Sequence, residues 1–238
     1  MRVQRLLLVL LWLALPALAQ TPVDIGSEPH HHLVFENDQV RVFSLALHPS
    51  ERAFVRHTHN FLVVTLQDCE MVMWAEGESD ILNFRFNQGD ARFFFGGFAR
   101  GIRNDHTSEY RNITVEFLNS KVTTYGYQTN IGGWQYGGSV LAQPVDPRAK
   151  FVDSLRLGEA TTRDVQLLAG DALPAPEKDV SELVIPVTDI DLNSQGGERM
   201  RKSQGEVVWI AGRQRELVNR DALPARFVVV ELKHAPGS

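Results

Sequence analysis

The sequence predicts an all-β protein built from two jelly-roll barrels in tandem, and three observations support this prediction. Apolar and alternating runs of four to eight residues follow one another along most of the chain, which is typical of strands. Glycine, asparagine and proline separate many of these runs, as tight turns require. A block of residues in the first half recurs in the second half, which indicates that one structural unit is used twice.

The alternation is clearest at Phe43, Leu45 and Leu47, whose large side chains should lie on one face of a strand. Further strands of the first half are expected at residues 53–59, 61–66, 71–75, 81–86, 92–95 and 111–118. The pattern resumes at residues 183–187, 207–210 and 226–232. Between them, the polar and glycine-rich segment 189–204 is expected to be a long hairpin loop.

The first twenty residues have the three zones of a secretory signal. Arg2 and Arg5 precede an apolar run at residues 6–15, and the small-residue motif Ala17-Leu18-Ala19 follows. About ten apolar residues are too few for a membrane span, which needs about twenty. We therefore expect a cleaved signal peptide, a mature chain that begins at Gln20 or Thr21 without a membrane span, and export to the periplasm or the extracellular space.

Charge and cysteine content exclude some classes of partner and of stabilisation. The chain has 24 basic and 29 acidic residues and a net charge of −5, and loss of the two leader arginines makes it −7. An acidic balance argues against nucleic acid and acidic membranes as partners. Cys69 is the only cysteine, so no disulfide can form within one chain, and its apolar flanks predict a buried, unreactive thiol.

Residues 125–145 interrupt the strand pattern with Gly, Asn, Gln, Tyr and Trp, and Pro144 and Pro147 lie at their end. We interpret this stretch as a linker packed by Trp134 and Tyr136. The expected organisation is a signal peptide at 1–20, a barrel at 21–124, the linker at 125–145 and a second barrel at 146–238.

The repeat matches four residue types in the two halves, each pair separated by 115 positions: Gly97, Arg100, Asn104 and Glu116 with Gly212, Arg215, Asn219 and Glu231. The glycines that open the two blocks, Gly89 and Gly205, are 116 apart. A nearly constant offset over about twenty positions indicates a true structural repeat. We therefore expect the barrels to superpose with Arg215 on Arg100 and Asn219 on Asn104.

This block resembles the second motif of the cupin superfamily, in which Gly-Asp, an apolar strand and a glycine turn precede a metal-binding His, with Asn four residues later. The segment His57-Thr58-His59 is similar to part of the first motif, a His-x-His pair followed by a Glu. The resemblance covers residues 34–118 and, more loosely, 155–232. It implies a bicupin, that is, two double-stranded β-helix barrels in one chain.

His57 and His59 are the candidate metal ligands, because residues two apart on a strand point to the same face. They would hold one divalent transition metal in the N-terminal barrel, completed by His106, His48 or an N-terminal histidine. The alternative is a pair of barrel-mouth histidines that hydrogen-bond to neighbours. Within the tract at 30–32, His30 and His32 should share one face of an extended strand, and the tract is interpreted mostly as surface.

The sequence departs from the family pattern at the remaining ligand positions. Val63 occupies the place of the family's Glu, and Arg100 occupies the place of its final His. A guanidinium has no lone pair with which to bind a metal. In the second half Lys178 and Val180 fall where the His pair would lie, so the second barrel is expected to be metal-free.

Arg100 and Arg215 point to an anionic ligand instead, because a guanidinium in a concave barrel binds carboxylate, phosphate or sulfate bidentately. The alternatives are an internal salt bridge to Glu116 or Glu231, or a solvated arginine at a strand end. The candidate ligand-binding residues are Arg100, Phe93 and Phe95.

Three functions remain open. The first is an exported module that binds a small, anionic molecule in the N-terminal barrel. The second is a metal-dependent enzyme of the dioxygenase or isomerase type that uses His57 and His59. The third is a structural or interaction protein whose barrels are filled by aromatic side chains such as Phe84, Phe86, Phe94 and Phe95. Unpaired sheet edges also suit a homodimer.

Overall fold

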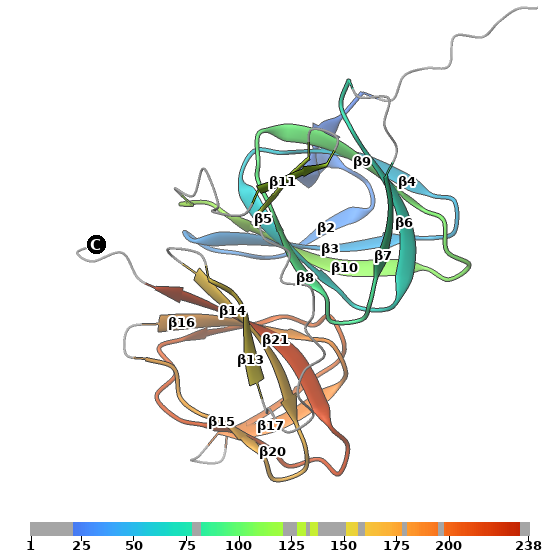
Figure 1. Ribbon diagram of the computed structural model, residues 1–238. Coiled ribbons are helices and arrows are strands. Elements are labelled where there is room, and N and C mark those ends of the chain that lie inside the picture. Colours follow the sequence, from blue (N-terminus) through green and yellow to red (C-terminus); the bar gives the residue numbers. More distant parts are fainter. Residues whose placement is uncertain are drawn as a thin grey trace, which may run out of the picture.

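The computed structural model describes residues 21–77, 82–120, 128–131, 134–137, 151–156, 160–177, 180–194 and 198–233. The expected signal peptide at 1–20 lies outside these residues. The described residues form two all-β units that lie one above the other in Figure 1. The helical segment η1 (Ile25–Ser27) has three residues, and no described helix is long and apolar enough to cross a membrane.

The N-terminal barrel consists of two sheets. One sheet has the order β1 (Val23–Asp24), β4 (Arg52–His57), β9 (Phe98–Asn104), β6 (Cys69–Ala75) and β7 (Leu82–Phe86). The other has the order β11 (Gln128–Ile131), β12 (Trp134–Gly137), β8 (Ala91–Phe94), β5 (Asn60–Thr65), β10 (Tyr110–Phe117), β3 (Val40–Leu47) and β2 (His31–Glu36). Strands β11 and β12 come from the stretch interpreted as a linker, and β12 pairs with β8 of the barrel.

The C-terminal barrel repeats this arrangement. One sheet has the order β13 (Phe151–Arg156), β14 (Ala160–Leu167), β21 (Ala225–Lys233), β16 (Val180–Pro186) and β19 (Val208–Ala211). The other has the order β15 (Ala172–Leu173), β20 (Leu217–Asn219), β17 (Ile190–Ser194) and β18 (Arg199–Lys202). Strands β14-β21-β16-β19 correspond to β3-β10-β5-β8, and β15-β20-β17-β18 correspond to β4-β9-β6-β7. The predicted tandem of jelly-roll barrels is confirmed, and the segment expected as a long loop forms the β17–β18 hairpin.

The two repeat asparagines occupy equivalent corners. Asn104 Nδ2 donates to the carbonyls of Leu47 and Ser108, and its Oδ1 accepts from the His106 amide. Asn219 makes the same three hydrogen bonds, with the carbonyls of Leu167 and Leu223 and the amide of Asp221. Both asparagines are fully buried. The repeated Asn therefore fixes the same corner in each barrel.

The repeat arginines are not equivalent, which corrects the expectation drawn from the offset. Arg100 is buried on β9, where it pairs with Val55 and Ala75 of the neighbouring strands. Arg215 is exposed and lies outside β20, which begins at Leu217. The spacing is kept, but the C-terminal strand is too short to include this position.

The barrels pack against each other through the outer faces of their larger sheets (Figure 1). Their shared apolar core includes Val64 and Val115 of the first barrel and Ile185 and Val230 of the second. Two glutamines cross this junction with matching hydrogen bonds. Gln88 Nε2 donates to the carbonyls of Leu66 and Val187, and Gln204 Nε2 donates to the same two carbonyls. The outer faces of the two larger sheets therefore form a shared apolar core, with the two glutamines bonded across it.

Candidate binding cavity

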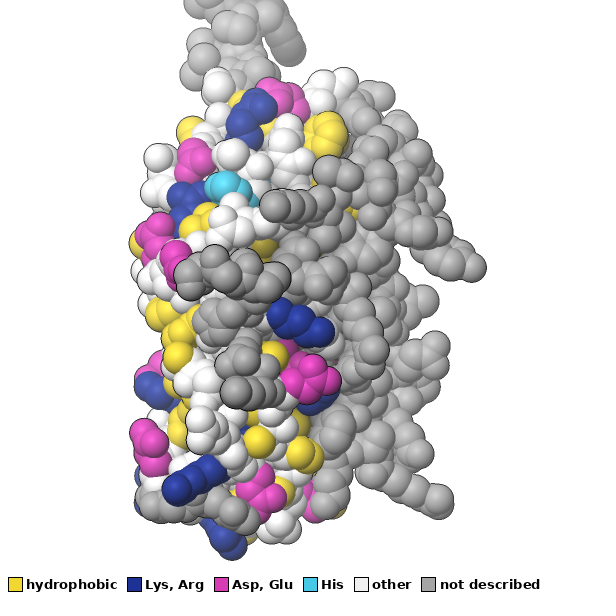
Figure 2. Space-filling view, turned by 90° about the vertical axis from the view of Figure 1, so that its left-hand side faces the viewer, with side chains coloured by type: hydrophobic (Ala, Val, Ile, Leu, Met, Phe, Trp, Pro, Cys, Tyr) yellow, Lys and Arg dark blue, Asp and Glu magenta, His cyan; other side chains and the backbone are white. Residues whose placement is uncertain are grey.

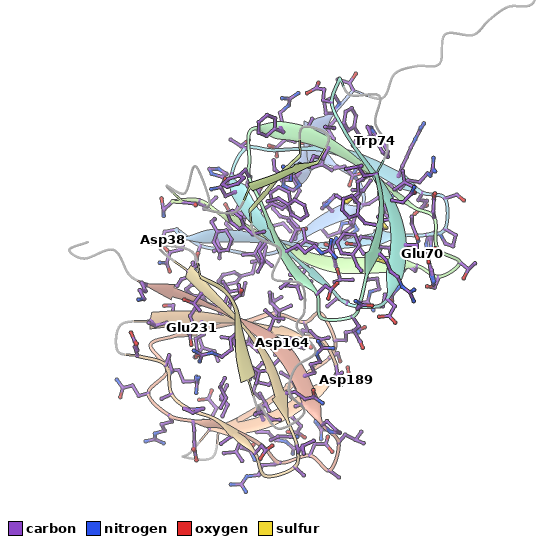
Figure 3. All side chains as sticks on the ribbon, viewed as in Figure 1. Asp38, Glu70, Trp74, Asp164, Asp189 and Glu231 are labelled. Carbon is purple, nitrogen blue, oxygen red and sulfur yellow. The ribbon has the colours of Figure 1, made fainter. Side chains whose placement is uncertain are left out.

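The N-terminal barrel encloses a cavity of about 50 Å³. Many side chains point into the interior of this barrel (Figure 3), and the cavity is the small space between them. Its apolar lining comes mainly from Leu45, Val55, Phe61, Val63, Met71, Met73, Phe86, Phe94 and Ile102. Its polar lining comes from His31, His57, Arg100, Tyr110, Asn112 and Thr114.

His57, the last residue of β4, is held by a buried carboxylate. Its Nδ1 lies 3.1 Å from Oε1 of Glu116 on β10, and its ring stacks on Phe61 at a centroid distance of 3.6 Å. The other oxygen of Glu116, Oε2, accepts from Arg41 Nη2 at 2.6 Å. Because Glu116 accepts at Nδ1, a neutral His57 keeps Nε2 as its hydrogen-bond acceptor.

Burial sets the charge state of His57, and hydrogen bonds set that of Glu116. Burial lowers the pKa of His57 to about 4, although the Glu116 carboxylate acts in the opposite direction. For Glu116, burial favours the protonated form, but the hydrogen bonds with His57 and Arg41 outweigh it and lower the pKa of the carboxyl group. At neutral pH the site therefore contains a neutral imidazole, a carboxylate and the Arg41 cation.

A second carboxylate positions a second imidazole. Glu28 is buried, and its Oε2 lies 2.6 Å from His31 Nδ1 while its Oε1 lies 2.7 Å from His30 Nδ1. Burial opposes ionisation of Glu28, but the hydrogen bonds with His31 and His30 lower its pKa to about 2. His31 is buried and lines the cavity, so the tract interpreted as mostly surface contributes one side chain to the site.

Arg100 introduces a cation beside the cavity from β9. Its Nη2 donates to the Phe95 carbonyl at 3.1 Å, and its guanidinium lies 5.4 Å and 5.0 Å from the ring centroids of Phe61 and Phe94. Cation–π contacts of this kind stabilise a buried guanidinium. The hydrogen bonds of Glu116 go to His57 and Arg41, so the structure gives no direct Arg100–Glu116 bond among those described.

Strand β10 contributes a row of polar side chains to the cavity. Thr114 Oγ1 donates to Asn112 Oδ1 at 3.1 Å, and Asn112 Nδ2 donates to the Tyr110 hydroxyl at 2.8 Å. Alternate residues of a strand share one face, so these three groups lie together on the inner face of the sheet. Burial raises the pKa of Tyr110, which therefore stays a neutral phenol.

The structure places two groups of predicted site residues differently. Phe93 and Phe95 belong to the apolar core between the barrels, whereas Phe94 lines the cavity, because neighbouring residues of a strand point to opposite faces. His59 follows the end of β4 in the turn to β5 and does not line the cavity. Thus His57 and Arg100 both line the cavity, and the nearby imidazole is that of His31 and not that of His59.

The residues present do not fit the metal that the cupin resemblance implies. The described residues contain no group of three or more His, Cys, Asp and Glu side chains that could hold a metal ion. A catalytic zinc site, for example, uses three protein ligands, and here only His31 and His57 line the cavity as imidazoles. Arg100 occupies the remaining family position and cannot act as a ligand.

The C-terminal barrel has a different interior. The positions of β21 equivalent to Tyr110, Asn112 and Thr114 are Ala225, Phe227 and Val229, which belong to its apolar core. Its buried ion pair joins two residues that the sequence analysis did not single out. Arg213 donates to Glu182 through Nε at 2.5 Å and through Nη2 at 2.8 Å, and both side chains are buried.

No protein-family model matches the chain, and no curated protein matches it in sequence. Solved structures do match it. AerE from Microcystis aeruginosa has a TM-score of 0.58 at 8% identity and covers 87% of this chain and 99% of its own. A cupin 2 conserved barrel domain protein from Leptotrichia buccalis has a TM-score of 0.55 at 9% identity over 85% and 88%.

A salicylate 1,2-dioxygenase from Pseudoaminobacter salicylatoxidans, solved in complex with gentisate, has a TM-score of 0.58 at 13% identity. It covers 88% of this chain and 76% of its own. Identities this low show the fold alone. The chain has the cupin fold, and its tandem of cupin-like barrels is as predicted.

Proposed function

We propose that this chain is an exported binding protein whose N-terminal barrel holds a small carboxylate. The observation that supports this proposal is the buried guanidinium of Arg100 beside a cavity that also presents an amide, hydroxyls and imidazoles. A guanidinium recognises a carboxylate with paired, charge-assisted hydrogen bonds, which are strong where water is excluded. The leader-like residues 1–20 support export.

The size of the cavity limits the ligand. A cavity must have about 10–15 Å³ to hold one water molecule, so a cavity of 50 Å³ accommodates about four water-sized groups. Drug-sized ligands occupy pockets of about 300–1,000 Å³. The cavity therefore suits a two-carbon acid such as acetate or glycolate.

The tautomer of His57 favours a hydroxy acid over a simple acid. With Nδ1 engaged by Glu116, Nε2 accepts a hydrogen bond, which a ligand hydroxyl can donate. The carboxylate of the same ligand would lie at Arg100. Glycolate offers both groups, whereas acetate offers only the carboxylate.

Calorimetric titration of residues 21–238 with glycolate, acetate and uncharged glycolamide tests this proposal. We expect glycolate to bind more tightly than acetate and glycolamide to bind poorly. Arg100→Gln should weaken glycolate binding about tenfold or more, since a charge-assisted pair is lost. The control Arg56→Gln removes an exposed arginine that pairs with Glu76 and should leave binding unchanged.

Failure of the wild type to bind either acid, or equal binding by the Arg100→Gln variant, would contradict the proposal. The metal content of the same untagged protein separates it from the enzyme hypothesis. Near-stoichiometric metal would favour a metal-dependent enzyme, while a wild type that binds neither metal nor small anions would favour the filled-barrel, structural role.

A further inference from the structure

A second hollow lies in the C-terminal barrel, between its edge strands β18 and β19. It is a cleft of about 630 Å³, much larger than the cavity of the first barrel. In the N-terminal barrel the equivalent edge strand β8 is covered by β12. Among the described residues, β19 pairs only with β16, so this edge is open in the second barrel.

The cleft is rich in cations. Its basic lining residues are Arg199, Arg201, Lys202, Arg213 and Arg215, and its acidic lining residue is Glu198. Two of the cations are compensated by ion pairs, since Lys202 pairs with Glu206 and Arg213 with Glu182. The other three basic residues are Arg199 and Arg201 of β18 and Arg215. Figure 2 shows one face of the molecule, on which basic and acidic side chains are interspersed over the described residues.

Arg199 and Arg201 are held side by side by one carboxylate. Arg199 Nε lies 2.7 Å from Asp191 Oδ1, and Arg201 Nη2 lies 2.8 Å from Asp191 Oδ2. The hydrogen bonds from both arginines lower the pKa of Asp191 well below its usual range. Two guanidiniums that share one carboxylate carry one net positive charge.

These arginines remain accessible although they are positioned. Asp191 is buried, but the side chains of Arg199 and Arg201 are 57% and 71% exposed. Each guanidinium has five N–H donors, and those not directed at Asp191 are available to another acceptor. Arginines fixed in this way lose little conformational entropy when they bind an anion.

Apolar residues provide much of the rest of the lining, and Met200, Val208 and Ile210 among them pack against the core of the second barrel, whereas Trp209 packs toward the first barrel. The ring of Trp209 is fixed from the other barrel, because it stacks on Phe35 at a centroid distance of 5.6 Å. A volume of 630 Å³ falls in the range of pockets that hold ligands with one or two rings. The lining therefore suits a ligand with an apolar body and a negative head group.

We propose that this cleft binds an aromatic organic anion, such as an aryl carboxylate or sulfonate. The head group pairs with Arg199 and Arg201, and the ring lies over Met200, Val208 and Ile210. The site is separate from the cavity of the N-terminal barrel in ligand size and in the residues that form it.

Calorimetric titration of residues 21–238 with 2-naphthalenesulfonate tests the proposal, with uncharged 2-naphthol for comparison. We expect the sulfonate to bind, to bind more weakly as sodium chloride is raised, and to bind more tightly than the naphthol. Arg199→Gln and Arg201→Gln should each weaken sulfonate binding about tenfold, the equivalent of one charge-assisted contact. Each variant leaves Asp191 paired with the other arginine, so the fold should be retained, which a melting curve verifies.

Two controls locate the site. Arg56→Gln changes an exposed arginine of the other barrel, and Arg100→Gln changes the small cavity; both should leave sulfonate binding unchanged. Equal binding of 2-naphthol, unchanged affinity in both β18 variants, or loss of binding in Arg100→Gln would each overturn the proposal.

Discussion

The two barrels have the same strand order and the same asparagine corners, but they enclose different chemistry. Strand β10 presents Tyr110, Asn112 and Thr114 to the interior of the first barrel, whereas β21 presents Ala225, Phe227 and Val229. The first barrel retains a small cavity with polar groups in its lining, whereas apolar core residues occupy the equivalent positions of the second barrel, whose cleft lies at the edge between β18 and β19. Thus corners and turns preserve the fold, while a few inner positions on one strand determine whether the barrel interior is polar or apolar.

The largest effect is expected when Asn, the residue at position 112 of the first barrel, replaces Phe227 at the equivalent position of the second. Phe227→Asn should reduce the free energy of unfolding by about 5 kcal/mol, because it removes a buried ring and leaves an amide without a designed partner. Urea unfolding measures the loss. Phe227→Leu, which keeps the site apolar, should cost much less; equal costs would show that polarity does not distinguish the two interiors.

Removal of the buried asparagine should destabilise the two equivalent corners, at Asn104 and Asn219, by similar amounts. Asn104→Ala and Asn219→Ala each remove three hydrogen bonds to the backbone and should each cost about 3 kcal/mol. Denaturation curves of the two variants give the comparison. Costs that differ by much more than about 1 kcal/mol would mean that the corners, like the interiors, have diverged in their energetic role.

Acid should weaken the first barrel selectively. His57 has a folded-state pKa of about 4 against an ordinary value of 6.5, so the unfolded chain binds the extra proton first as pH falls. The stability that neutral His57 contributes is present above pH 6.5 and is lost as pH falls toward 4, by up to about 3 kcal/mol. The only histidine of the second barrel, His234, lies outside the described residues.

Unfolding free energies at several pH values between 6.5 and 4 test this expectation. His57→Asn should flatten the pH dependence in this window. His48→Asn, which changes an exposed histidine, should reproduce the wild-type slope. A wild-type slope retained in His57→Asn would assign the effect to other groups.

The smallest expected change in stability concerns two equivalent turns, one after β3 and one after β14. Ser50 has φ 69° and Gly170 has φ 81°, a conformation that favours glycine. Gly170→Ser should destabilise the protein by about 1 kcal/mol, and Ser50→Gly should stabilise it slightly. Thermal melts measure both changes; a stabilising Gly170→Ser would show that the turns are not equivalent.

The sequence predicts the fold better than the site, for reasons visible at particular residues. Glycine turns, strand lengths and the repeated Asn104 and Asn219 are local signals, and each lies where the tandem-barrel prediction requires it. The position of Arg100 beside a cavity also follows from the motif. The exposed position of Arg215 does not follow from the motif, because a constant offset does not reveal that β20 is short and begins at Leu217.

The lining aromatics could not be chosen from the sequence alone. Phe93, Phe94 and Phe95 are identical in type, and packing between the barrels makes both faces of β8 apolar, so no alternation marks the inward residue. Whether His59 lines the cavity depends on where β4 ends, and the position of the His31 side chain depends on its contact with Glu28. The available sequence signal for His31 is Glu28, a carboxylate three residues before it.

The paired glutamines at the junction have a consequence for how the two halves stay together. Gln88 and Gln204 each bond to both Leu66 and Val187, so the halves exchange equivalent contacts across an approximate twofold axis. Such an isologous interface is the kind that closes a dimer of identical subunits. Joining the barrels in one chain makes this association intramolecular, and its strength becomes independent of protein concentration. Because Cys69 is the only cysteine, no disulfide joins the two halves, and their covalent connection in one chain keeps this association independent of dilution.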